Sequence, residues 1–471
     1  MIKNRPLLLV LIVLAAVKLA LIPFIDVTDA DAYSRVQLAH DWIQNPQWIS
    51  NSVWAPLHLY LIGGALWISN HFYYTPIFLH IILSLIGIWA VYKWLRCWTS
   101  SKTAIIFAIV FAMSPLLFRN SFLALSLTPF LVFVALALFH ISRALHSRSI
   151  IPALYAGIFM TLACGFRYEG WLIAFLIPAI FIWKKQYASF FGYGLTAALF
   201  PTVWMISCYL STGDAFYGIN GNSEWITQHT NLKTSDLRTE DILKRIWFFP
   251  FSLAITIGPA FIVYIFLKRK SIGPLSDFSK LVIVLTTVVL CIFITNSISG
   301  SLMHHHRFSG ILLLLLILPM AELCNKVIQT KAAVLLIVVS FFLGFIYNTK
   351  GISPIPIVTG SCDDHNSAIY GNLNASSFLI IDFLGWEETY SMAAKCREKT
   401  NSIYLVSGST QSHLNENMLL HTIKGKESGY LCLNPKNMRL DTAKIESIMK
   451  DKGFRRLISI DEDEFMSIHY Y

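Results

Sequence analysis

The chain has 471 residues, of which 55% are hydrophobic and 14% charged, and its mean hydropathy is +0.58. These values exclude an ordinary soluble domain and are typical of a helical protein that crosses a membrane several times. The net charge of +10 sits largely in short basic clusters between apolar runs. Such clusters are typical of cytoplasmic loops, so the basic balance does not indicate a nucleic-acid partner.

The first apolar run, residues 6–24, is long enough to cross a bilayer. Lys3 and Arg5 precede it, which predicts a cytoplasmic N-terminus and an exit on the outer side. A cleaved signal peptide is disfavoured because Lys18 lies inside the run, no small-residue cleavage site follows, and many more apolar runs come later.

Acidic residues cluster where this run ends, at Asp26, Asp29 and Asp31. The spacing of apolar residues then predicts an amphipathic helix over 31–42, lying on the outer surface. The acids also have a structural interpretation, with Thr28 or Asp29 as the helix cap and Asp31 paired to Arg35 one turn later.

Further apolar runs up to residue 347 bring the expected total to about eleven or twelve membrane segments. If the run 76–95 points inward and the later runs alternate, the basic clusters all face the cytoplasm. The run 56–69 does not fit that alternation, so it either dips into the membrane and returns or breaks the rule. We therefore expect a transmembrane module over 1–347, with an external loop 26–55, and an extracytoplasmic tail over 348–471.

The tail predicts a small α/β domain. Its expected elements are strands over 378–383 and 402–407, helices over 386–399 and 441–452, and a strand or hairpin over 456–470. Cys362, Cys396 and Cys432 lie in this tail. Outside the cell one pair of them would be able to oxidise, and the pairing stays open.

Five polar segments meet on the outer side in this topology: the loops 26–55, 211–245 and 296–307, and the turns 119–121 and 167–170. The runs that flank the last turn are short for full spans, which need about 20 residues. Arg167 and Glu169 are therefore expected below the outer surface, within a cavity, where ionisable groups are paired with each other or bind something.

These outer segments carry the residue types that a transfer reaction needs. A carboxylate accepts the proton of an attacking hydroxyl or amine, and cations stabilise a departing phosphate. Arg119, Arg167 and Arg307 are suited to phosphate because the guanidinium fork binds two oxygens. The run His304-His305-His306 does not predict a metal site, because neighbouring side chains diverge. His58 has a structural interpretation as a hydrogen-bonded histidine at the membrane boundary.

The order of these features resembles the GT-C superfamily of integral-membrane glycosyltransferases, which includes the protein O-mannosyltransferases and the lipid A aminoarabinose transferases. Each motif alone is weakly specific, and their order over about the first 350 residues is more specific. The matching segments are Asp29-Ala-Asp31-Ala-Tyr33, Trp54-Ala-Pro56-Leu-His58-Leu-Tyr60, Ser114-Pro115-Leu-Leu-Phe-Arg119, Gly165-Phe-Arg167-Tyr168-Glu169-Gly170, and His306-Arg307-Phe308 with Pro319. The chain departs from the pattern in having Asp-Ala-Asp-Ala where many relatives have Asp-Glu, and Ala55 where many have a second proline.

This resemblance implies a sugar donor on polyprenyl phosphate, an outer-face reaction by direct, inverting displacement, and a glycan, lipid or protein acceptor. It implies Asp29 or Asp31 as the general base, and Arg307, helped by Arg167 and Arg119, as the holder of the lipid phosphate. The other residues expected around the substrate cavity are Asp26, Tyr33, Trp54, His58, Tyr168, Glu169 and His306. The metal-dependent oligosaccharyltransferase branch is not indicated, because its Trp-Trp-Asp-Tyr-Gly motif is missing, so no metal or other cofactor is expected. The expected location is a bacterial inner membrane.

Two other classes of function compete with this hypothesis. A flippase for lipid-linked saccharides, or another transporter, would also have many spans and charges in a cavity. The hydropathy pattern shows no inverted repeat, and a large external loop with an external tail favours an enzyme. A non-catalytic membrane scaffold would leave the buried Arg167 and Glu169 unexplained.

Overall fold

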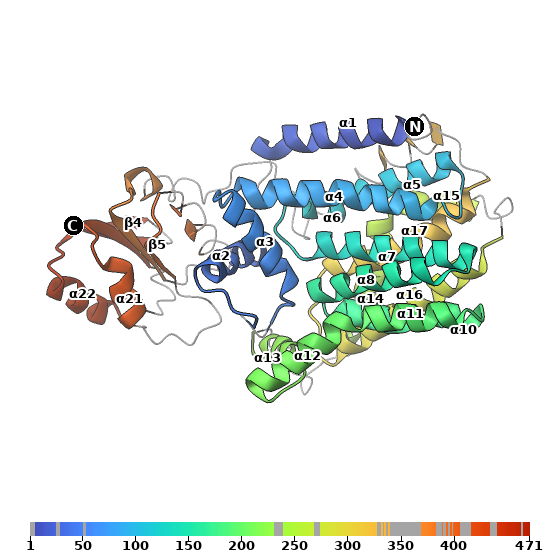
Figure 1. The fold of residues 1–471 in the computed structure, drawn as a ribbon. Coiled ribbons are helices and arrows are strands. Elements are labelled where there is room, and N and C mark those ends of the chain that lie inside the picture. The colour runs from blue at the N-terminus through green and yellow to red at the C-terminus, as the bar shows by residue number, and fades with distance from the viewer. Residues whose placement is uncertain are drawn as a thin grey trace. The chain divides into compact units, whose positions relative to one another are not determined.

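The computed structural model describes residues 5–24, 29–49, 53–229, 239–267, 274–326, 331–332, 334–335, 338–339, 369–382, 389, 392–393, 396–397, 399–405, 416–433, 440–462 and 465–471. Clustering of its contacts divides the chain into two compact units. The first comprises Met1–Ile25, Pro46–Leu61 and Phe78–Pro356, and the second comprises Asp26–Asn45, Ile62–Ile77 and Ile357–Tyr471. Helices dominate the first unit, and a five-stranded sheet lies in the second (Figure 1).

Five helices in the described part of the chain are long and apolar enough to cross a membrane. They are α4 (Tyr74–Leu95), α7 (Leu127–Ser147), the consecutive pair α11 (Tyr187–Ala197) and α12 (Leu199–Thr212), α16 (Asp277–Ile298) and α17 (Arg307–Cys324). Shorter apolar helices are α3 (Leu57–Ile68), α5 (Ser101–Ala112), α8 (Ile150–Phe166), and the pair α9 (Glu169–Leu176) and α10 (Ala179–Trp183). The predicted fold class, a polytopic helical membrane protein with a small α/β domain, is confirmed.

The other helices of this part of the chain include one that lies wholly, and one that lies partly, in a predicted loop. They are α1 (Arg5–Leu21), η2 (Ile22–Phe24), α2 (Ala30–Gln44), α6 (Pro115–Asn120), α13 (Tyr217–His229), α14 (Thr239–Ile257) and α15 (Pro259–Leu267). The predicted loop 211–245 thus contains α13 and the start of α14. Gly258, with a φ of 95°, separates α14 from α15, and Pro259 then opens α15.

Helix α3 covers most of the run 56–69. It has 12 residues, which rise about 18 Å, whereas a bilayer core is about 30 Å thick. Helix α5 is equally short, so helix length alone does not separate a run that crosses from one that dips.

The core of the first unit is built on α8, which packs along α7 and α11 (Figure 1). Gly157 on α8 permits the close approach of α11, because a Cβ atom at that position would lie 1.9 Å from Thr196 Oγ1. Thr196 Oγ1 in turn donates to the carbonyl oxygen of Leu154, at 3.2 Å. Small residues are the usual means by which membrane helices approach each other closely.

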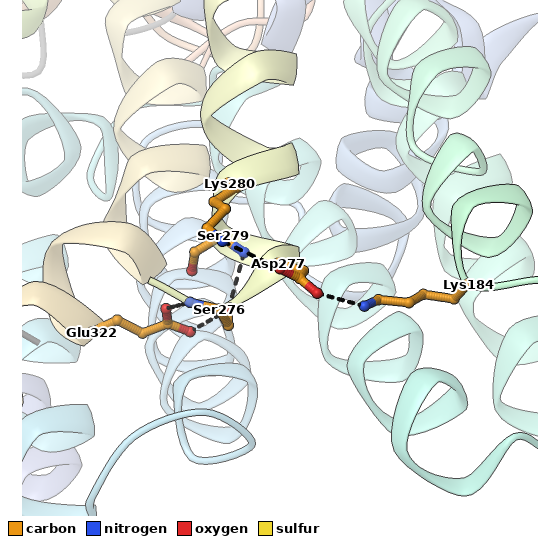
Figure 2. A network of polar contacts seen from close by, with 6 residues as sticks. All are labelled: Lys184, Ser276, Asp277, Ser279, Lys280 and Glu322. Carbon is orange, nitrogen blue, oxygen red and sulfur yellow. Dashed lines mark hydrogen bonds and ion pairs between the residues drawn. The ribbon is translucent and has the colours of Figure 1, made fainter. Parts of the chain in front are cut away.

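The basic clusters meet at one end of this bundle. Figure 2 shows Lys184, which follows α10, reaching Asp277 at the start of α16, with Nζ 2.8 Å from Oδ2. Beside this pair, Ser276 donates to Glu322 near the end of α17, from the backbone N–H to Oε2 (2.8 Å) and from Oγ to Oε1 (2.7 Å).

Two further contacts join the same end. Trp98, beyond α4, donates from Nε1 to Ser142 Oγ on α7, at 2.8 Å. Asn325 Oδ1, just after α17, accepts from the backbone N–H of Ser100 and from Thr103 Oγ1 at the start of α5. We call this region, residues 96–103, 142–149, 184–187, 276–280 and 322–326, the basic end. The alternation predicted from the positive residues requires these segments to meet.

The second unit contains a mixed sheet with the strand order β2-β1-β3-β5-β4. The strands are β1 (Ser377–Ile381), β2 (Ile403–Leu405), β3 (Ser428–Leu433), β4 (Arg456–Glu462) and β5 (Phe465–Tyr470). Strand β1 runs parallel to β2 and β3, whereas β5 is antiparallel to β3 and β4. The tail prediction located β1, β2 and the final hairpin, and missed the central strand β3.

Side chains alternate across the sheet and build two apolar layers. Phe378 and Ile380 face a cluster that includes side chains of α21 (Glu416–Ile423) and α22 (Thr442–Asp451). Leu379 and Ile381 face the opposite cluster, with Met392, Cys396 and Cys432. Cys432 is a buried free thiol there, and Cys362 lies outside the described residues.

Helix α2, which lies in the predicted external loop 26–55, is grouped by its contacts with the tail in the second unit. Its side chains Tyr33 and Gln37 contact residues of the sheet domain.

Candidate functional site

Arg167 and Glu169 form a two-point ion pair where α8 ends and α9 begins. Arg167 is the C-cap of α8 and has an extended backbone, and Glu169 is the first residue of α9. Arg167 Nη2 lies 2.6 Å from Glu169 Oε1, and Nε lies 3.1 Å from Oε2. Arg167 Nη1 also donates to Ser126 Oγ, at 3.4 Å. The paired geometry fixes the plane of a buried guanidinium.

Arg307 joins this pair through a shared aromatic ring. It begins α17, and the next residue, Phe308, is buried. The guanidinium of Arg167 lies 5.4 Å from the centre of the Phe308 ring, and that of Arg307 lies 5.9 Å from the same centre. Two arginines therefore converge on one aromatic ring.

The three consecutive histidines diverge, as expected for neighbouring side chains. His304 Nε2 lies 2.6 Å from Ser297 Oγ, at the end of α16. His306 Nδ1 lies 2.7 Å from Ser252 Oγ on α14, while His305 Nδ1 accepts from the backbone N–H of Arg307. Within the described ranges, no group of three or more His, Cys, Asp and Glu side chains is placed to hold a metal ion.

His306 opens a buried chain of hydroxyl groups between α14 and α17. Ser252 Oγ donates to Ser309 Oγ at 3.1 Å, and Ser309 Oγ lies 2.8 Å from Thr256 Oγ1. Burial lowers the pKa of His306 to about 4. The imidazole is therefore neutral near pH 7, and the cations beside it are the arginines.

Other expected cavity residues occupy defined positions in the first unit. His58 on α3 is fully buried, with its Nε2 3.1 Å from Nε2 of His80 on α4, in line with its structural interpretation. Tyr168 is largely buried, and its hydroxyl lies against Gly218 of α13, where a Cβ atom would come within 1.9 Å. Trp54 is half-buried in the bend before α3, and Arg119 lies on α6.

The acids Asp29 and Asp31 belong to the second unit, whereas the arginines belong to the first. Asp29 is the N-cap of α2, and its Oδ1 accepts from the Ala32 N–H at 3.0 Å. Asp31 lies in the first turn and is half-buried. The cap interpretation of Asp29 is therefore realised, and its side chain has a fixed direction. Asp26 lies outside the described residues.

Sequence reasoning missed two cations of the first unit. Lys18 on α1 is 1% exposed, donates from Nζ to Ser84 Oγ at 2.8 Å, and lies 5.5 Å from the centre of the Phe118 ring. Its signal was visible, since a lysine inside an apolar run is costly unless it has a role. Arg245 is also buried and donates from Nη1 to the carbonyl oxygens of Ser297 and Ile298 at the end of α16.

Comparison with models of protein families gives no match, and comparison with curated proteins gives none. Among solved structures, the chain is similar to ArnT from Cupriavidus metallidurans in the apo state, with 8% identity over 97% of both chains and a TM-score of 0.44. It is similar to the Archaeoglobus fulgidus oligosaccharyltransferase, with 13% sequence identity and a TM-score of 0.44; the match covers 90% of this chain and 67% of that chain. It is also similar to the arabinofuranosyltransferase AftD from Mycobacteria, with 13% sequence identity and a TM-score of 0.45; the match covers 98% of this chain and 41% of that chain. At these identities the similarity concerns the course of the backbone alone.

Proposed function

We propose that the chain is a membrane glycosyltransferase that moves a sugar from a polyprenyl-phosphate donor to a glycan, lipid or protein acceptor at the outer face. Asp29 or Asp31 would act as the general base, and Arg307 and Arg167, with Arg119, would hold the phosphate of the lipid. The observation that carries the proposal is the convergence of Arg307 and of Arg167, which is paired with Glu169, on the ring of Phe308.

Charge at this site favours an anionic ligand. Two guanidinium groups lie against the Phe308 ring, and Arg167 is paired with Glu169. Guanidinium groups suit a phosphate because their planar fork donates to two of its oxygens. Since Arg167 donates to both carboxylate oxygens of Glu169, we assign the direct phosphate contact to Arg307.

The reaction would proceed by direct displacement. An aspartate takes the proton of the acceptor hydroxyl as its oxygen attacks the anomeric carbon. The bond between that carbon and the phosphate oxygen breaks, and the lipid phosphate leaves with the electron pair. Arg307 and Arg167 stabilise the charge that develops on this phosphate, which is the largest electrostatic demand of the step.

The basic end favours an orientation for this chemistry. Segments rich in lysine and arginine gather there, as they do on the cytoplasmic side of inner-membrane proteins. Arg167 and Arg307 belong to the opposite termini of their helices. The proposed location is therefore a bacterial inner membrane, with the N-terminus cytoplasmic and the arginine site and the tail domain extracytoplasmic.

The decisive experiment measures transfer from radiolabelled polyprenyl-phosphate sugars in membranes that contain the full chain. The double variant Asp29→Asn/Asp31→Asn should abolish transfer. Asparagine caps a helix as well as aspartate does, so the change removes negative charge and leaves α2 intact. Glu224→Gln, an exposed acid on α13, is the matched control and should transfer normally.

A second arm addresses the phosphate. Arg307→Ala should raise the apparent KM for the donor about tenfold or more, because a charge-assisted contact of about 1.5–3 kcal/mol is lost. Lys184→Ala, at the basic end, is the control and should leave KM unchanged. Transfer that survives loss of both acids would overturn the base assignment. Absence of transfer by the folded native chain from every donor would favour the transporter.

A further inference from the structure

Arg397 contacts α2 from the sheet domain of the second unit. Its Nε donates to Gln37 Oε1 at 2.6 Å, and its Nη2 lies 3.7 Å from Asp41 Oδ1. The amide of Gln37 completes the network, because its Nε2 donates to both carboxylate oxygens of Asp41, at 2.9 and 3.1 Å. The Arg397 side chain is only 6% exposed. An arginine buried to that degree is costly unless its partners are held in place.

A second contact lies one turn towards the acids. Tyr33 is buried, and Leu405 at the end of β2 packs against it. Tyr33, Gln37 and Asp41 are spaced four residues apart, so they form one stripe along α2. The sheet domain therefore contacts α2 over two turns of a single face.

Other parts of the second unit contact further side chains of α2. The ring of Trp42 packs closely against Gly63 on α3, where an added Cβ atom would lie 2.7 Å from Trp42 Cε3. Phe72 packs against His40, with ring centres 4.8 Å apart, and lies beneath the Arg397 guanidinium at 5.7 Å. Arg397 thus joins α2 to the segment that follows α3.

We propose that the sheet domain is the support that orients α2, and that Arg397 is a positioning residue for Asp29 and Asp31. The part that concerns transfer rests on the function proposed above. A helix is rigid over three turns, so fixing Tyr33, Gln37 and Asp41 also fixes the first turn. A misplacement of about 1 Å at a reacting group costs about a hundredfold in rate.

The test compares Arg397→Ala with Arg456→Ala in the full chain. Arg456 pairs with Glu446 on the same domain at 2.9 Å, but this pair is exposed and does not involve α2. Hydrogen exchange of the backbone amides of residues 30–44 needs no substrate and measures directly how firmly α2 is held in place. Arg397→Ala should speed that exchange at least tenfold, and Arg456→Ala should not change it.

Transfer kinetics supply the second readout. Arg397→Ala should lower kcat about tenfold to a hundredfold and leave the donor KM unchanged, whereas loss of folded protein would also lower the Tm. Arg397→Lys should recover part of the rate, because its ammonium still reaches Asp41 but lacks the forked donor for Gln37. If Arg397→Ala does not fold, Gln37→Ala removes the same contact from the side of the helix.

The two proposals fail in different ways. If hydrogen exchange in α2 is unchanged in Arg397→Ala, the proposal that the sheet domain supports α2 is overturned, whatever the transfer assay shows. Faster exchange with normal kcat, in a chain whose Asp29→Asn/Asp31→Asn variant is inactive, would overturn the positioning role and leave the proposed function intact. Normal transfer by that double variant would overturn the assignment of Asp29 or Asp31 as the base, and the exchange result would still decide whether the sheet domain holds α2 in place.

Discussion

Glu322 at the basic end offers a quantitative test of the helix packing. Its two carboxylate oxygens accept from the backbone N–H and the hydroxyl of Ser276 (Figure 2), at 2.8 and 2.7 Å. The residue is 8% exposed. Hydrogen bonds to a charged group contribute about 1.5–3 kcal/mol each. Ser276 keeps its own cap bond to the Ser279 N–H when Glu322 is removed. We therefore expect Glu322→Ala, which removes both bonds, to destabilise the first unit by about 3–6 kcal/mol.

The control lies beside it. Asp277 forms ion pairs with Lys184 and Lys280, but its side chain is 48% exposed. Exposed pairs contribute little, so Asp277→Asn should leave the stability unchanged. Glu322→Gln should fall between the two, because an amide keeps one acceptor oxygen.

The assay is unfolding of the purified chain in detergent, followed by thermal scans and by titration with denaturant. Glu322→Ala should lower the Tm by several degrees, and Asp277→Asn should match the native chain. Equal losses in the two variants would refute the reasoning, because burial would then not decide the strength of these contacts. No loss with Glu322→Ala would show that water replaces the carboxylate at this helix end.

Three further outcomes are expected. Gly429→Ala should destabilise the sheet domain by about 1–3 kcal/mol, because the new Cβ would lie 2.4 Å from the Phe378 ring. Gly371→Ala should not destabilise it, because the space around Gly371 is open. Hydrogen exchange of the backbone amides of β1 checks both outcomes. Burial raises the pKa of Cys432 far above its ordinary value, so the thiol should resist maleimide at pH 8 in the folded chain and react after denaturation; rapid labelling when folded would contradict the buried position. Because the pKa of His306 is lowered to about 4, the unfolded chain binds more protons than the folded chain between pH 6.5 and 4. The free energy of unfolding should therefore decrease as the pH is lowered from 6.5 to 4. A His306→Phe variant should show a smaller fall in the Tm, and an equal fall would contradict this assignment.

The membrane helices were predictable because they depend on local composition. Apolar runs of sufficient length and the placement of basic residues indicated the crossings, and the structure adds the breaks at Pro178 and Gly258. The short α3 was the exception, since hydropathy alone does not say whether an apolar run crosses or dips. Its 12 residues are as many as those of α5, so helix length does not decide the question either.

The tail was predicted less well, and β3 shows why. It lies between β1 and β5, and its residues from Gly429 to Leu433 are all buried. A central strand lacks the alternation that marks a half-exposed one, so its sequence resembles any short apolar run.

The arginine site was partly predictable. The pairing of Arg167 with Glu169 follows from their closeness in sequence and the short flanking runs. The approach of Arg167 and Arg307 to the Phe308 ring does not, because it depends on where the start of α17 lies relative to the turn between α8 and α9. Arg245 had no local signal either, since its acceptors lie 52 and 53 residues away in the chain.

The second unit is assembled from segments that the ribosome produces far apart in time. Gln37 and Arg397, which touch in the finished protein, are 360 residues apart. At about 5–20 residues per second, α2 emerges about 20–70 seconds before its arginine partner. During that interval the first helices can enter the membrane while α2 still lacks its support. Folding of the sheet domain would then be the step that fixes the orientation of Asp29 and Asp31. A nascent or truncated chain would be inserted in the membrane but not yet active in transfer.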